Sequence, residues 1–188
     1  ERKGAANIAS SALRISAMLA FPMGVGLFVL GTPIIKLLFS GLNPELAGPL
    51  LSTLGLATAF VCMMLVCNSI LQANGFVNLP VVVMVLGGVV KIVSNYNMVA
   101  IPKVGIFGVP FGNVLCFGLS LVLDLIIISR VLRGRPGYLG IFLKPFAAAA
   151  IMGAGAWAVY GLVFKFLHSN TVAVVCAIGV AVVIYAVL

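Results

Sequence analysis

The stretch LPVVVMVLGGVVKIVSNYNMVAI, residues 79–101, decides the class of fold. It is an almost unbroken apolar run of 23 residues whose one charged residue is Lys91. A helix of roughly 20 apolar residues is long enough to cross the hydrocarbon core of a bilayer. The stretch therefore predicts a transmembrane helix, and it raises the question of why a lysine stands near the middle of it.

The composition of the whole chain points to the same medium. Of its 188 residues, 63% are hydrophobic and only 7% are charged, whereas about 25% of the residues of a soluble domain are charged. The net charge is +8, but no basic cluster is interleaved with aromatic residues, so we expect no nucleic-acid partner. With three acids, one histidine and four cysteines inside apolar runs, we expect neither an enzyme nor a metal or cofactor site.

Six segments are long and apolar enough to span a membrane, so we predict an all-α integral membrane protein with about six transmembrane helices. They cover residues 13–39, 46–73, 79–101, 106–130, 145–167 and 171–188. Short connections predict that sequential helices are antiparallel neighbours, and Pro145 suits the first position of the fifth helix. The chain begins at Glu1 and stops within an apolar run, so we expect it to be a piece of a longer protein.

Basic residues predict the orientation, because cytoplasmic loops carry an excess of lysine and arginine. With the N-terminus in the cytoplasm, seven basic residues lie inside and three outside. The inside set is Arg2, Lys3, Arg14, Arg130, Arg133, Arg135 and Lys144, and the outside set is Lys36, Lys103 and Lys165. We therefore expect both ends of this chain to face the cytoplasm.

Lys91 is the first candidate for a functional side chain. A charge at the centre of a membrane helix costs about 2.5–3.5 kcal/mol on insertion scales. Asn95 lies one turn further along the same face, and Ser94 is beside it. We expect this stripe to face protein or a water-filled cavity, where Lys91 would meet an anionic group; the alternative is a structural lysine paired with helix-end carbonyls or an acid.

A second polar stripe occupies the fourth span. Ser120 and Asp124 each fall within about 20° of Asn113 on a helical wheel. Lys91 and Asp124 differ in depth by roughly 13 Å at about 1.5 Å per residue, so we expect no direct salt bridge between them.

Two further features have open interpretations. Asn68 and Gln72 form a third stripe at the end of the second span, where amides serve as caps or interhelical hydrogen bonds as well as ligand contacts. Pro22 lies inside the first span and is either a functional hinge or a static bend.

Alanines at every fourth position of the last two spans predict close packing between these two helices. The expected partners are Ala150, Ala154 and Ala158 on one helix with Ala173, Ala177 and Ala181 on the other.

Three stretches together resemble the C-terminal half of the polysaccharide-biosynthesis flippases of the multidrug/oligosaccharidyl-lipid/polysaccharide exporter superfamily. They are LRISAMLAFPMGVGLFVLGTPIIKLLFSG (residues 13–41), LQANG (71–75) and VKIVSNYNMVAIPKVGIFGVPFGNVL (90–115). The likeness is greatest to the stage V sporulation protein B branch, which is related to the lipid II flippases. It covers residues 13–132, while the last two helices are similar only in position and hydropathy.

The resemblance implies about fourteen helices in two lobes that rock about a central cavity. Residues 1–133 would form a four-helix bundle of the C-terminal lobe, and residues 134–188 two additional helices that help to form an apolar groove for a lipid tail. The partners implied are the N-terminal lobe of the same chain, membrane lipids and a lipid-linked oligosaccharide, in the bacterial cytoplasmic membrane.

The function expected from this resemblance is to flip an undecaprenyl-linked oligosaccharide or peptidoglycan precursor by alternating access, without covalent chemistry. Lys91 would attract its pyrophosphate or carboxylate, and Asn95, Asn113 and Ser120 would hydrogen-bond its sugars. A cation-coupled multidrug antiporter of the same superfamily is the alternative, and Asp124 is the one membrane acid it could use. A membrane scaffold without transport activity is a third possibility, but it gives little reason to bury Lys91.

Overall fold

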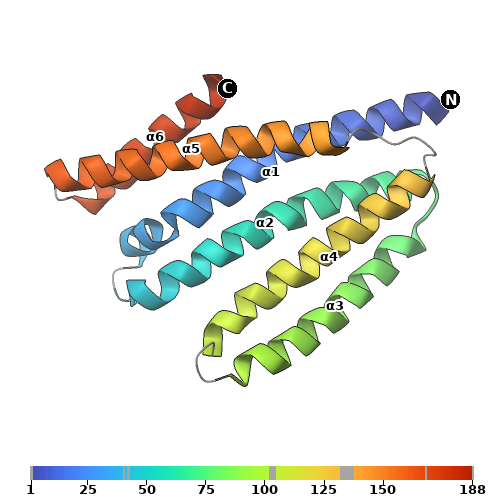
Figure 1. Cartoon of the computed structure of the whole chain (residues 1–188), viewed down its shortest axis with the longest axis horizontal. Coiled ribbons are helices and arrows are strands. Elements are labelled where there is room, and N and C mark those ends of the chain that lie inside the picture. Colours follow the sequence, from blue (N-terminus) through green and yellow to red (C-terminus); the bar gives the residue numbers. More distant parts are fainter. Residues whose placement is uncertain are drawn as a thin grey trace.

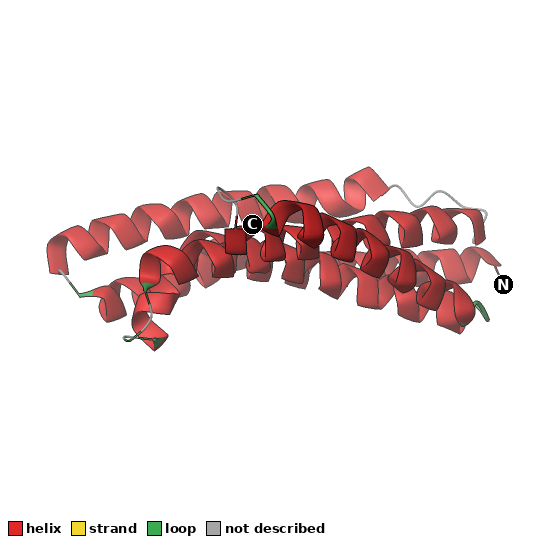
Figure 2. Cartoon of the chain, turned by 90° about the horizontal axis from the view of Figure 1, so that it is seen from below, coloured by secondary structure: helices red, strands yellow, loops and turns green. Residues whose placement is uncertain are grey.

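The computed structural model describes residues 2–39, 41, 43–101, 105–131, 138–167 and 169–187, and within these ranges all regular structure is helical (Figures 1 and 2). The helices are α1 (Arg2–Leu38), α2 (Pro44–Ala73), α3 (Asn78–Val99), α4 (Gly108–Val131), α5 (Tyr138–Leu167) and α6 (Asn170–Val187), with the short 3₁₀ helix η1 (Gly105–Phe107) leading into α4. All six α-helices are long and apolar enough to cross a membrane. The predicted fold class is confirmed.

Local sequence explains the ends of α2. Pro44 occupies the first helical turn, where its missing N–H costs nothing, and Glu45 in the same turn complements the helix dipole. At the other end the Asn74 N–H binds the carbonyls of Ile70 and Leu71. Gly75 then adopts a φ of 87°, which glycine reaches without strain and which turns the chain into α3.

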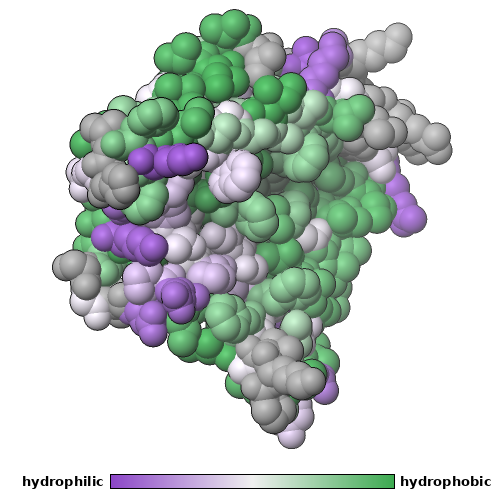
Figure 3. All heavy atoms as spheres, turned by 60° about the vertical axis from the view of Figure 1, so that its left-hand side comes forward, coloured by the Kyte–Doolittle hydropathy of each residue, from purple (hydrophilic) through white to green (hydrophobic). Residues whose placement is uncertain are grey.

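The helices lie side by side in a curved layer, with α3 at one edge and the α5–α6 pair at the other (Figures 1 and 2). Sequential helices pair as predicted in α1–α2, α3–α4 and α5–α6. The prediction is wrong for α2 and α3, which barely touch, because the face of α2 that is not covered by α1 packs against α4. Much of the surface is hydrophobic, and the hydrophilic residues lie mainly on the left of the view in Figure 3, with a few at the upper and right-hand edges.

Two pairs of glycines let α1 and α2 approach closely. Gly24 of α1 lies opposite Gly55 of α2, and Gly31 lies opposite Gly48. A Cβ atom at Gly24 would stand only 3.0 Å from the Gly55 carbonyl oxygen, and one at Gly31 only 3.0 Å from the Gly48 carbonyl oxygen. Small residues at such positions allow the backbone contact that drives helix association in lipid.

The fifth helix begins earlier than predicted, at Tyr138, so the placement of Pro145 at its first position is wrong and Pro145 lies inside α5. The added turns are held against α1 by aromatic contacts. The ring of Phe21 meets those of Phe142 and Phe146 edge-on, at centroid distances of 6.4 and 5.7 Å. These contacts and the buried Ile141 stabilise helix on both sides of the proline.

The alanine prediction is right for α6 and wrong for α5. Ala173, Ala177 and Ala181 are buried, but Ala150, Ala154 and Ala158 are exposed. Helix α5 instead buries Ala149, Met152 and Ala156. The reason is that α5 packs against both α1 and α6, and this other face can contact both, as the core cluster of Leu30, Met152, Ala156, Ala177 and Ala181 demonstrates.

Helix α1 continues through Pro22 and Pro33 without a break. The predicted boundary between residues 133 and 134 lies outside the described residues, as do Lys103, Arg133 and Arg135. Helices α2 and α4 lie on one side of α1 and the α5–α6 pair on the other.

Candidate functional site

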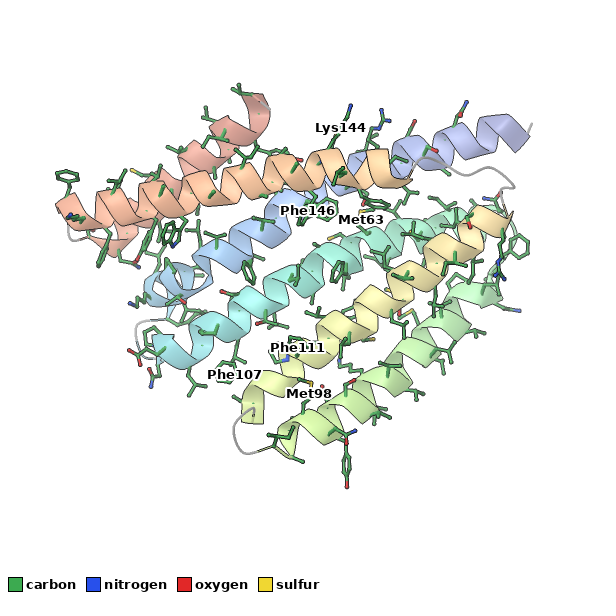
Figure 4. The ribbon with its side chains drawn as sticks, viewed as in Figure 1. Met63, Met98, Phe107, Phe111, Lys144 and Phe146 are labelled. Atoms are coloured by element: carbon green, nitrogen blue, oxygen red, sulfur yellow. The ribbon has the colours of Figure 1, made fainter. Side chains whose placement is uncertain are left out.

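The α3–α4 interface is a close seam built on glycines. A Cβ atom at Gly87 of α3 would collide with the Ser120 hydroxyl of α4, and one at Gly112 of α4 would collide with the Asn95 side-chain oxygen of α3. At the end of the hairpin a Cβ at Gly108 would stand 2.8 Å from the Met98 Cβ, and Figure 4 shows Met98 beside the start of α4. We call this contact the α3–α4 seam.

Lys91 lies on the seam face of α3, one turn after Gly87 and one turn before Asn95. Its side chain is half-buried, as are those of Ser94 and Asn95. Cys116 of α4 lies against Gly87, one turn before Lys91. Among the described residues no ion pair neutralises Lys91, so the predicted stripe does turn toward protein while its ammonium group is left without an acidic partner.

Ser120 and Asp124 occupy the same helix, one turn apart, and are 1% and 0% exposed. Leu121 and Ile128, on the same side of α4 as Asp124, share a buried cluster with Cys67 and Leu71 of α2, so the carboxylate lies on the side of α4 that faces α2. Neither carboxylate oxygen of Asp124 has a hydrogen-bond partner in the described part of the chain. This agrees with the prediction that Lys91 and Asp124 form no direct salt bridge.

Three asparagine side chains add to the buried polar groups. The side-chain oxygens of Asn68, Asn95 and Asn113 are buried, and within the described ranges they have no hydrogen-bond partner. With the hydroxyl of Ser120 and the carboxylate of Asp124 they make up the buried side-chain polar atoms that the described residues leave unpaired. We call these five residues and Lys91 the polar set; they come from α2, α3 and α4.

The polar set includes six of the eight residues predicted from the sequence to bind substrate. Ser94 is half-buried beside it, whereas Gln72 is exposed in the last turn of α2. Each buried polar group without a partner costs free energy, and more so in a membrane, where no water replaces the missing bond. The arrangement therefore suits an interior that receives water, a polar ligand or another part of the protein.

The second feature of the structure is an apolar groove between α1, α5 and α6. Its volume is about 460 Å³. It is lined by Met18, Leu19, Pro22, Met23, Gly26, Leu27, Leu30, Ile34, Met152, Ala156, Ile178, Ala181, Val182, Tyr185 and Ala186. The residues of α1 that line it could not be identified from the sequence, because the hydropathy of a membrane helix is high on every side.

Three hydrogen bonds at the two ends of this groove were also missed by sequence reasoning. Tyr185 of α6 donates from its hydroxyl to the Met18 carbonyl of α1, at 2.7 Å. Asn170, at the start of α6, donates to the Pro33 carbonyl at 3.1 Å and accepts from the Tyr160 hydroxyl of α5 at 3.0 Å. A signal was present, since a proline four residues after Met18 leaves that carbonyl without its helical donor.

Among the described residues, no three or more histidine, cysteine, aspartate or glutamate side chains lie together as a group that could hold a metal ion.

The model of the family described as lipid II flippase MurJ matches residues 1–181. No curated protein and no solved structure matches the chain.

Proposed function

We propose that this chain, which belongs to the lipid II flippase MurJ family, forms the C-terminal part of a transporter that flips an undecaprenyl-linked precursor across the membrane by alternating access. The family match over residues 1–181 is the observation that carries the proposal. It supports a flippase of lipid-linked precursors, and the two surfaces of the structure agree with a substrate of this kind.

A lipid-linked precursor has a long apolar tail and a polar head, so its transporter needs two kinds of surface. The groove between α1, α5 and α6 is lined almost wholly by apolar side chains, which suits an isoprenoid tail. The polar set lies on the other side of α1, on α2, α3 and α4. We infer that the head is received there while the tail stays in contact with the groove and the lipid.

Each candidate residue receives a role on this basis. Lys91 is the cation for a pyrophosphate or carboxylate, because the described acids leave it unpaired and an unpaired membrane charge is by default a functional site. Asn95, Asn113 and Ser120 hydrogen-bond sugars. Asn68 and Asp124 extend the polar surface toward the cytoplasmic end, and Ser94 and Gln72 are peripheral contacts. Pro22 is the hinge of α1.

The finer assignments belong to the same proposal. Peptidoglycan precursor and polysaccharide repeat unit are both candidate substrates, and the family match favours the first. We place the protein in the bacterial cytoplasmic membrane with Glu1 on the cytoplasmic side, with residues 1–133 and 134–188 as separate units and an N-terminal lobe as their partner. Membership of the stage V sporulation protein B branch stays a prediction.

A cation-coupled antiporter is the second candidate, and one observation favours it. Asp124 is fully buried, and among the described residues it has no hydrogen-bond partner, which suits a carboxylate that binds a coupling ion. The family match and the unpaired Lys91 favour the flippase, because a cavity cation repels cationic drugs.

The test is a flipping assay in proteoliposomes that contain the complete protein and fluorescent undecaprenyl-linked precursors. We expect a lipid-linked precursor to become accessible in the opposite leaflet only when the protein is present, and cationic drugs not to be exported. Drug export without precursor flipping would instead establish the antiporter.

A further inference from the structure

Pro22 leaves one backbone carbonyl of α1 without its helical hydrogen bond. In an α-helix the N–H of residue i binds the carbonyl of residue i−4, and proline has no N–H. The carbonyl concerned belongs to Met18, which lies within the apolar part of α1 that is long enough to cross a membrane, Asn7–Leu38. In hydrocarbon such a group must find another donor within the protein.

The donor comes from α6. The Tyr185 hydroxyl is 2.7 Å from the Met18 carbonyl oxygen, the usual length of an O–H to oxygen hydrogen bond. Fifteen residues earlier on α6, Asn170 donates to the Pro33 carbonyl, fifteen residues later on α1. The two antiparallel helices are thus joined at two matching levels, and one of the two carbonyls is the one that Pro22 frees.

The three residues involved in the first hydrogen bond, Met18, Pro22 and Tyr185, all line the apolar groove. Met18 and Pro22 form part of its α1 wall, and Tyr185 forms part of its α6 wall. The groove also meets Gly26, where a Cβ atom would find nothing within 4 Å, so this wall of α1 is open to an occupant. A chain lying in the groove would touch both the weakened turn of α1 and the tyrosine that completes it.

We propose that Tyr185 is a positioning residue that completes the turn of α1 weakened by Pro22, and that through this hydrogen bond the occupancy of the apolar groove is coupled to the shape of α1. The hydrogen bond fixes the spacing of α1 and α6 around the groove. When it is absent, the Met18 carbonyl is unsatisfied, the turn loosens and the walls no longer hold an isoprenoid chain as tightly. The coupling to a lipid rests on the proposed function, whereas the hydrogen bond itself does not.

A double-mutant cycle in the complete protein tests the hydrogen bond without any ligand. Tyr185→Phe removes only the hydroxyl, and Pro22→Ala restores an N–H that can bind the Met18 carbonyl within α1. A hydrogen bond of this kind contributes on the order of fivefold to an equilibrium constant. We expect Tyr185→Phe to shift the unfolding equilibrium in bicelles about fivefold in the wild-type background and less than about twofold in the Pro22→Ala background.

Tyr96→Phe is the matched control, because Tyr96 is 80% exposed on α3 and its hydroxyl is remote from α1. We expect Tyr96→Phe to shift the unfolding equilibrium by the same factor in the wild-type and Pro22→Ala backgrounds. An equal loss from Tyr185→Phe in both backgrounds would overturn the proposed role of Tyr185.

Photolabelling with a diazirine derivative of farnesol tests the coupling to the groove. We expect labelling of the groove helices to fall about fivefold in Tyr185→Phe and to return in Tyr185→Phe/Pro22→Ala. The proposed coupling would be overturned if the stability measurements gave the expected result but neither substitution changed the labelling of the groove. Absence of groove labelling in the wild type would count against the proposed lipid substrate, while the stability cycle would still decide the role of the hydrogen bond.

Discussion

Gly87 and Gly88 are neighbours in α3 with opposite surroundings, and this makes a sharp test of the α3–α4 seam. A Cβ atom at Gly87 would collide with the Ser120 hydroxyl and stand 3.2 Å from both the carbonyl oxygen and the sulfur of Cys116. A Cβ atom at Gly88 would meet nothing within 4 Å. The perturbation is the same methyl group, Gly→Ala, placed at each position in turn.

The magnitude follows from two terms. Replacing glycine by alanine inside a helix stabilises it by about 0.8–1.0 kcal/mol in host peptides, and this gain is common to both positions. Overpacking a close contact costs typically 1–3 kcal/mol, and only Gly87→Ala incurs it. The difference between the two variants is therefore about 1–3 kcal/mol, which is roughly a 5- to 150-fold difference in the unfolding equilibrium constant.

The measurement is the free energy of unfolding of each variant in bicelles, with Gly88→Ala as the control. A rescue variant identifies the contact. Ser120→Ala removes the closest atom, so Gly87→Ala/Ser120→Ala should recover most of the loss. Equal stability of Gly87→Ala and Gly88→Ala would refute the close packing of α3 on α4, and with it the orientation of Lys91 toward α4.

Three further substitutions test the two surfaces in the complete protein. Lys91→Met should abolish flipping with little loss of expression, whereas Lys36→Met, which removes an exposed lysine near the end of α1, should not; wild-type flipping by Lys91→Met would remove this lysine from the mechanism. Asp124→Asn should leave the free energy of unfolding unchanged or higher, because the carboxylate has no partner among the described residues; a loss of about 3–5 kcal/mol would reveal a paired charge. Gly26→Leu fills the groove where space is open and should lower flipping at least tenfold at unchanged expression, as judged against Gly161→Leu, a position with equal space on α5 outside the groove.

The apolar runs, with the prolines and glycines that border them, were sufficient to predict six helices and most of their starts and ends. The predicted starts and ends of α2, α3 and α4, the ends of α1 and α5 and the start of α6 lie within two residues of the observed ones, whereas α1 begins at Arg2 and not at Leu13. The start of α5 was missed because Pro145 was taken as a helix start, while aromatic contacts to Phe21 extend the helix beyond it. The lateral order of the helices was missed because connection lengths restrict neighbours in sequence and say little about which faces meet.

The polar part of the candidate site was more accessible to sequence reasoning than the apolar part. A polar residue in a span is conspicuous, and wheel positions were enough to predict that Asn113, Ser120 and Asp124 share a face. The contribution of α1 to the groove had no such signal, since Met18, Met23 and Leu27 differ little from the lipid-facing residues beside them. The alanine pattern predicted the wrong face of α5 because small residues recur on more than one face of this helix. Which of these faces packs against α6 depends on the position of α1.

The chemistry of the polar set restricts the head group that it could receive. The six unpaired buried atoms are oxygens: three amide oxygens, one hydroxyl and two carboxylate oxygens. An amide can also turn to present its N–H groups, whereas a carboxylate only accepts hydrogen bonds. A pyrophosphate is acceptor-only and negatively charged, so of the polar set only Lys91 offers it a countercharge. Sugar hydroxyls both donate and accept, and they suit the amides, Ser120 and Asp124. A head group with its phosphates near Lys91 and its hydroxyls along α4 would give partners both to the lysine and to the buried oxygens. A hydrophobic cation would leave the amides and Lys91 without partners.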